Sequence, residues 1–230
     1  MGPDDDGVLE LIPRPRRTIG PGVVHLPGWL GLPAQRRLVE AARGWARQGP
    51  GARRATLPGG ARMSVETVCL GWHWIPYRYS RTRDDQDGSP VQPFPGWLAE
   101  LGAEAVADAY GDPDARATYR PDVALVNSYR GDARLGMHQD REERASDPVV
   151  SLSLGTACVF RIGSPHHRRG PFHDVELCSG DLLVFGGENR LVHHGVPRLL
   201  PERDVPRIGT DPGERLNLTL RVSGLEAPSS

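Results

Sequence analysis

The sequence predicts a mainly β domain, built as a barrel or sandwich and preceded by two helices. From Asp122 onward, short apolar runs recur at close intervals, separated by glycine, proline or charged turns. This spacing is typical of all-β folds, because βαβ units would place helical patterns between the strands. The runs cover residues 123–129, 149–154, 157–162, 175–178, 182–185, 192–196 and 216–222.

The two predicted helices lie upstream of these strands. Apolar residues recur at helical spacing over residues 33–48 and again over residues 97–110. Gly111 ends the second helix, because glycine readily adopts the left-handed conformation found just after many helices. The apolar positions are Leu38, Val39, Ala42 and Trp45 in the first helix and Leu98, Leu101, Ala105 and Val106 in the second.

The chain is expected to form one domain with an elaborated N-terminal part, which suits a length of 230 residues. Residues 1–20 are rich in proline, arginine and aspartate, and we expect them to be flexible. The domain then spans residues 21–224, with its β core over about 120–224. Residues 225–230 form a tail.

Composition argues against several classes of protein. The three cysteines are far apart and include no C-x-x-C pair, which disfavours a disulfide framework or a zinc ribbon. No apolar run approaches the roughly 20 residues needed to cross a bilayer, and the acidic N-terminus is unlike a signal peptide. We therefore expect a cytoplasmic monomer with no membrane partner. The net charge of −1 does not by itself indicate a nucleic-acid partner.

The motif His138-Gln139-Asp140 is the first to suggest chemistry. In an extended strand, residues two apart point to the same side, so the imidazole and the carboxylate would project together. With a third ligand from another strand they would form a two-histidine, one-carboxylate triad, which holds Fe(II) and leaves positions open. The alternative is a surface His–Asp pair, because charged residues follow at 141–144.

A second motif is the histidine pair His193-His194, which follows a buried strand and a glycine turn. In an extended segment only one of the two side chains would face inward. The alternative is one histidine packed in the core and one facing solvent.

A third motif is the segment 215–221, in which polar and apolar residues alternate throughout. If the polar face points into a barrel, it carries two arginines inside. Buried guanidinium groups are unfavourable without an anion, and a dicarboxylate ligand would neutralise them through bidentate hydrogen bonds. The alternative is a solvated strand face. The polar residues are Arg215, Asn217, Thr219 and Arg221.

Taken together, these motifs resemble the AlkB family of Fe(II)/2-oxoglutarate-dependent nucleic-acid dealkylases. The resemblance covers about residues 20–224. It implies a double-stranded β-helix, or jelly roll, with flanking N-terminal helices and a nucleotide-recognition lid. It also implies Fe(II) as cofactor, with 2-oxoglutarate and O2 as co-substrates. The matching segments are 70–80, 125–129, 137–140, 185–195 and 215–221.

The resemblance assigns roles to individual residues. His138, Asp140 and His194 would bind the iron, because the family's second histidine ligand stands immediately before the glycine. Arg215 would pair with the distal carboxylate of 2-oxoglutarate, and Arg221 would help to hold the carboxylate end. The other residues implied to hydrogen-bond the co-substrate are Asn127, Tyr129 and Asn217.

The lid, about residues 51–83, mixes aromatic residues with six arginines and one acid, Glu66. Arginine binds phosphate and an aromatic ring stacks on a base, so the segment suits a single-stranded or flipped nucleotide. A short strand pair is expected around 65–70 and 77–79. The alternative is a minor hydrophobic cluster with a solvated arginine rim. The expected substrate contacts are Trp72, Tyr77, Arg78, Tyr79 and Glu142.

The function implied is oxidative dealkylation of N-alkylated bases such as 1-methyladenine and 3-methylcytosine, as direct-reversal repair of DNA, with RNA open as a second substrate. Glu142 stands where the best-known family members carry aspartate, which leaves lesion preference open. Two alternatives also stay open. One is a 2-oxoglutarate-dependent hydroxylase or demethylase of a protein or small molecule. The other is a non-catalytic nucleic-acid-binding protein on the same fold.

Overall fold

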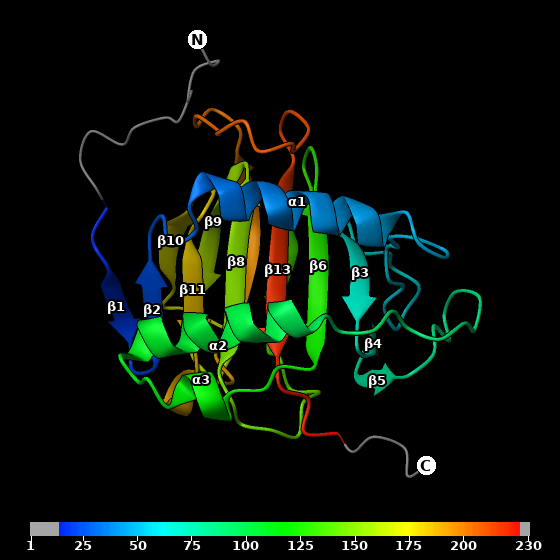
Figure 1. Ribbon diagram of the computed structural model, residues 1–230, viewed down its shortest axis with the longest axis horizontal. Helices are drawn as coiled ribbons and strands as arrows, with labels where there is room; N and C mark the ends of the chain where they lie inside the picture. Colours follow the sequence, from blue (N-terminus) through cyan, green and yellow to red (C-terminus); the bar gives the residue numbers. More distant parts are fainter. Residues whose placement is uncertain (1–13, 226–230) are drawn as a thin grey trace.

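The computed structural model describes residues 14–225, and eight consecutive strands form their core. These strands are divided between two antiparallel sheets, with the orders β11-β8-β13-β6 and β10-β9-β12-β7 (Figure 1). This arrangement is the predicted jelly roll. The strands are β6 Val123–Tyr129, β7 Leu135–His138, β8 Val149–Gly155, β9 Ala157–Ile162, β10 His173–Leu177, β11 Leu182–Phe185, β12 His194–Leu200 and β13 Arg215–Arg221.

Three further strands extend the larger sheet at its two edges. Strands β1, Arg17–Gly20, and β2, Val23–Leu26, continue it beyond β11, and β3, Glu66–Leu70, lies beside β6. Part of the segment expected to be flexible, residues 17–20, is therefore a strand that pairs with β2. Residues 1–13 of that segment, and residues 226–230 of the expected tail, lie outside the described residues.

The prediction that two strands of the lid pair with each other is wrong. Strand β3 does not pair with the segment around Tyr79 but joins β6, because four of its five residues are buried and need a sheet on which to pack. A separate two-stranded sheet forms between β4, His73–Ile75, and β5, Arg78–Ser80. Pro76 and Tyr77 make the turn between them, so this small hairpin stands apart from the main sheets.

Two long helices, α1 Leu32–Ala46 and α2 Gly96–Tyr110, lie across one face of the larger sheet (Figure 1). Leu216, Leu218 and Leu220 of β13 pack in the same apolar cluster as residues of these helices. Gly111 follows α2 with a left-handed φ of 65°, as expected for a helix end. The shorter helices are α3, Ala115–Thr118, and the 3-10 turn η1, Gly187–Asn189.

The helix layer determines which residues face the space between the sheets. Because side chains alternate along a strand, the leucines of β13 face the helices and its polar residues face the other sheet. A second apolar cluster fills part of that space, and a cavity of about 510 Å3 occupies another part. Within the described residues, no helix has the length and apolar character required to cross a membrane.

Candidate metal centre

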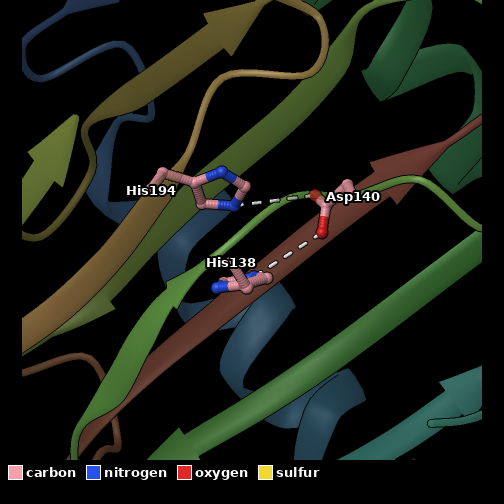
Figure 2. Close-up of side chains that lie close together, drawn as sticks. All are labelled: His138, Asp140 and His194. Carbon is pink, nitrogen blue, oxygen red and sulfur yellow. Dashed lines mark ion pairs between the residues drawn. The ribbon is translucent and has the colours of Figure 1, made fainter. Parts of the chain in front are cut away.

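Three side chains meet inside the cavity (Figure 2). His138 is the last residue of β7, and His194, the first residue of β12, is its partner in the register of those two strands. Asp140 lies two residues beyond the end of β7. One ligand atom from each of the three side chains lies within 4.8 Å of the others. Two neighbouring strands thus bring together residues that are far apart in the sequence.

The two imidazoles are oriented by backbone carbonyls. His138 Nδ1 lies 2.9 Å from the Gly136 carbonyl oxygen, and His194 Nδ1 lies 3.0 Å from that of Val192. A carbonyl can only accept, so each Nδ1 carries the hydrogen and each Nε2 has a free lone pair. The two Nε2 atoms face the Asp140 carboxylate at 3.6 and 3.7 Å, as Figure 2 shows. This tautomer is the one required for binding a metal through Nε2.

Gly195 lets β12, which carries His194, lie close to β7. A Cβ at this position would stand 2.6 Å from the Leu135 carbonyl oxygen, so only glycine lets β12 approach β7 this closely. His193 is not among the residues that line the cavity, and its Nδ1 donates to the Ser164 carbonyl at 2.7 Å.

Electrostatics keep two of the three groups, His194 and Asp140, in their metal-binding forms. Burial, followed by repulsion from His138, lowers the pKa of His194 to about 4. Burial acts to raise the pKa of Asp140, but Arg221 and the two histidines outweigh it and hold that pKa well below its usual range. At neutral pH the buried site therefore offers a carboxylate and a neutral imidazole, the forms that bind a divalent metal.

One oxygen of Asp140 supports the fit of a metal. Its Oδ2 is buried and accepts no hydrogen bond within the described residues. Arg221 Nη2 lies 2.9 Å away, in an alignment that makes an ion pair rather than a hydrogen bond. Two histidines and one carboxylate around such an atom are the donor set of a facial triad, which suits Fe(II) and leaves positions open.

Arg215 has the environment expected for a carboxylate-binding group. It is only 1% exposed, and its Nη2 donates to Ser153 Oγ at 3.0 Å. Its Nε and Nη1 are buried without a hydrogen-bond partner in the described part of the chain. A guanidinium left in this state is unfavourable until an anion reaches it. The distal carboxylate of 2-oxoglutarate fits this requirement, and the ring of Tyr129 lies 6.0 Å from the guanidinium carbon.

The two asparagines of the cavity differ in what they can offer a ligand. The Asn217 amide nitrogen donates to Ser151 Oγ at 2.8 Å and to the Leu152 carbonyl at 3.1 Å, which uses both of its hydrogens. In Asn127 the side-chain oxygen accepts from Thr67 Oγ1 at 2.8 Å. Because that bond leaves the amide nitrogen available, Asn127 is the better donor to a co-substrate and Asn217 serves as a packed support.

The substrate contacts expected from the sequence divide into two groups. Tyr77 and Glu142 line the cavity, whereas Trp72, Arg78 and Tyr79 do not. Trp72 is buried beneath the Arg81 guanidinium, and its Nε1 donates to Asp122 at 2.9 Å.

Trp74 lines the cavity instead of Trp72. Trp72 lies in the bend between β3 and β4, so strand alternation does not relate it to Trp74. Arg78 points elsewhere, because it pairs with Asp84 at 3.0 Å.

The cavity walls combine aromatic rings with cations. Trp74 and Tyr77 come from the β4–β5 hairpin, and Tyr77 is 71% exposed with a left-handed φ of 72°. Three exposed arginines from three different segments also line the cavity, and no ion pair holds their side chains within the described residues. We call this group the arginine rim. Its members are Arg62, Arg134 and Arg168.

Glu142 is a half-buried acid on the cavity wall. Burial raises its pKa first, and the neighbouring Asp140 and Glu143 carboxylates raise it further. Sequence reasoning singled out Glu142 but missed Glu143 and Arg190, which lie beneath the metal ligands. In the sequence, the only sign that Glu143 and Arg190 have a role is that they are charged residues next to the motifs.

The chain is similar to proteins of known class. The model of the 2OG-Fe(II) oxygenase superfamily matches residues 22–221. An alpha-ketoglutarate-dependent dioxygenase AlkB homolog of Caulobacter vibrioides is 40% identical over 93% of this chain and 92% of its own length. A DNA N(6)-methyladenine demethylase of Arabidopsis thaliana, ALKBH1D, is 30% identical over 89% of this chain and 50% of its own length. The solved structure of OsALKBH1 covers 90% of this chain and 100% of its own, with a TM-score of 0.79 and 30% identity.

Proposed function

The chain belongs to the AlkB family within the 2OG-Fe(II) oxygenase superfamily, and from that premise we propose that it removes N-linked alkyl groups from damaged nucleobases in DNA. It is a dioxygenase that uses Fe(II), 2-oxoglutarate and O2. When bound, these three supply the oxidant that hydroxylates the alkyl carbon while 2-oxoglutarate becomes succinate and CO2. The hydroxylated product then loses an aldehyde and leaves the free base.

The observation that carries this proposal is a single cavity with two different parts. Its inner wall holds the triad and the unpaired guanidinium of Arg215. Its outer wall holds the rings of Trp74 and Tyr77 together with the arginine rim. The inner part binds the metal and co-substrate, and the outer part suits a base that stacks on aromatic rings next to a phosphate backbone.

Glu142 supports a cationic base as the substrate. Bases methylated at a ring nitrogen, such as 1-methyladenine and 3-methylcytosine, carry positive charge. A half-buried carboxylate on the cavity wall offers them a counter-charge at low local polarity, where an ion pair is stronger than in water. An unmodified neutral base gains nothing from this contact, so Glu142 would favour the lesion.

The buried position of two of the three triad ligands supports a base presented outside the helical stack. His194 and Asp140 are 6% and 3% exposed, so the reacting alkyl group must enter the cavity. A base within a duplex cannot do this until it leaves the stack, and a damaged base does so at lower cost. The arginine rim would then hold the neighbouring phosphates.

The test is mass spectrometry of oligonucleotides that carry 1-methyladenine or 3-methylcytosine, incubated with Fe(II), ascorbate, O2 and 2-oxoglutarate. We expect loss of one methyl mass, dependent on 2-oxoglutarate and absent in the Asp140→Asn variant. Formation of succinate without any loss of methyl mass would overturn the proposed substrate while leaving the dioxygenase class intact.

A further inference from the structure

Beneath the metal ligands lies a buried cluster of charges centred on Glu143, whose side chain is fully buried. Arg221 Nη1 donates to Glu143 Oε1 at 3.0 Å, and Arg221 Nη2 forms the ion pair of 2.9 Å with Asp140. One guanidinium therefore bridges a metal ligand and a second carboxylate that takes no part in metal binding.

Arg190 closes the cluster from the other side. Its Nη2 donates to Glu143 Oε2 at 3.0 Å, and its Nη1 donates to the backbone carbonyl of Asp140 at 2.9 Å. Both carboxylate oxygens of Glu143 are thus occupied, and both arginines also reach Asp140, one at its side chain and one at its backbone. Two cations and two anions thus balance among side chains that are at most 6% exposed.

The cluster also reaches the hairpin that lines the substrate side of the cavity. Tyr79 of β5 donates its hydroxyl to Glu143 Oε1 at 2.5 Å and accepts from Arg221 Nη1 at 3.0 Å. Tyr77, two residues earlier in this hairpin, lines the cavity. Glu143 is therefore the one group of this cluster that contacts the hairpin, Arg221 and Arg190 together.

We propose that Glu143 is a positioning residue that sets the metal-binding carboxylate of Asp140 through Arg221 and ties it to the β4–β5 hairpin through Tyr79. With Glu143 in place, Arg221 interacts with two carboxylates, those of Asp140 and Glu143. Without the charge of Glu143, Arg221 interacts with Asp140 alone and competes more strongly with a metal for its oxygens. The hairpin would lose its attachment at the same time. The metal half of this proposal rests on the triad, and only the consequence for the hairpin rests on the proposed nucleic-acid substrate.

The test is the affinity of the chain for Mn(II), titrated by electron paramagnetic resonance without nucleic acid or 2-oxoglutarate. We expect Glu143→Gln to weaken Mn(II) binding by about tenfold or more, the usual effect of removing a group that orients a metal ligand. The matched control is Glu214→Gln. Glu214 is equally buried and pairs with Arg43 and Arg130, away from the cavity. The Glu214→Gln variant should lose stability but keep the Mn(II) affinity of the wild type.

A second pair of variants keeps the proposal testable if Glu143→Gln folds poorly. Tyr79→Phe removes only one hydroxyl and should weaken Mn(II) binding severalfold. Tyr110→Phe removes another partly buried hydroxyl, which donates to the Gly22 carbonyl at 2.9 Å, and should leave the affinity unchanged. Wild-type Mn(II) affinity in Tyr79→Phe and in any folded Glu143→Gln would overturn the proposal, as would equal losses in the test and control variants. A failure of dealkylation alone would leave this result unaffected.

Discussion

At the residue scale, each histidine of the metal centre is held through the ring nitrogen that a metal would not use. The carbonyls of Gly136 and Val192 fix the two imidazoles, and Nε2 of each ring faces Asp140. These carbonyls belong to residues two positions earlier in the chain, so each imidazole is oriented by its own strand or turn. Metal affinity thus depends on local backbone geometry as well as on the three ligands.

Arg215 gives a prediction that separates co-substrate binding from nucleic-acid binding. In Arg215→Lys, the ammonium lacks the planar fork needed for a bidentate carboxylate contact. Losing one charge-assisted hydrogen bond costs roughly 2 kcal/mol, so we expect the KM for 2-oxoglutarate to rise about thirtyfold. Oligonucleotide affinity, measured by fluorescence anisotropy, should stay at the wild-type value. Equal losses in both measurements would show that Arg215 has another role.

His194 predicts how the stability of the metal-free protein depends on pH. Its folded pKa of about 4 lies below the ordinary value of 6.5, so its contribution is fully present above about pH 6.5. As the pH falls toward 4, the unfolded state gains a proton that the folded state does not, and stability falls by about 3 kcal/mol. Urea unfolding in the presence of a chelator should show this loss. The loss of stability should be smaller in His194→Gln and unchanged in His166→Gln, where the altered histidine is exposed. An equal loss in the wild type and both variants would contradict the assignment of this pH dependence to His194.

At the element scale, the jelly roll was predictable where apolar runs were long and cleanly bounded. Strand β9 has the predicted limits, because Ala157–Ile162 is almost continuously apolar. Strand β7, Leu135–His138, was missed because its four residues include a glycine and lie among charged residues. Strand β1, Arg17–Gly20, was missed because Ile19 is its one large apolar residue and the strand depends on pairing with β2.

The site was predictable to the extent that function requires fixed sequence spacing. The triad follows from a histidine two residues before an aspartate and from a second histidine before a glycine. The direction of a side chain in a bend was not predictable from the sequence. Trp72 was therefore expected to contact the substrate, whereas Trp74 lines the cavity. Glu142 and Glu143 are adjacent acids, and only the folded loop shows that one lines the cavity and the other lies beneath it.

The β4–β5 hairpin gives a prediction in which stability and binding change in opposite directions. Tyr77 is held at a left-handed φ of 72°, which costs a bulky residue on the order of 1–3 kcal/mol. Tyr77→Gly removes that strain at a smaller entropic cost, so we expect stability to rise by about 1 kcal/mol. Oligonucleotide affinity should fall about tenfold or more, because stacking on a base contributes roughly 1–3 kcal/mol.

The comparison variant for this hairpin is Tyr77→Phe, which keeps both the ring and the strain. It should match the wild type in urea unfolding and in oligonucleotide affinity. Unchanged affinity in Tyr77→Gly would mean that the exposed ring does not touch the substrate.

At the scale of the whole molecule, the net charge of −1 means that attraction to nucleic acid must come from local charge. Some exposed arginines cannot supply it, because acids beside them cancel their charge. Arg116 pairs with Glu104, and Arg203 pairs with Glu176. The arginine rim differs from these paired arginines, since its side chains form no ion pair within the described residues and line the cavity that holds the triad. A protein of nearly neutral charge can therefore direct a phosphate backbone to one place.

This distribution predicts the salt dependence of binding. Each phosphate contact on a single strand contributes about 0.7 to the slope of log affinity against log salt concentration. Replacing all three rim arginines with glutamine should lower the magnitude of that slope by about 2 and weaken binding to methylated and unmethylated strands alike. The matched control replaces Arg116 and Arg203 with glutamine, which changes the net charge but leaves the rim intact, so its slope should equal that of the wild type. A fall in slope in the control as large as that in the rim variant would mean that the overall charge, and not the cavity opening, sets the attraction.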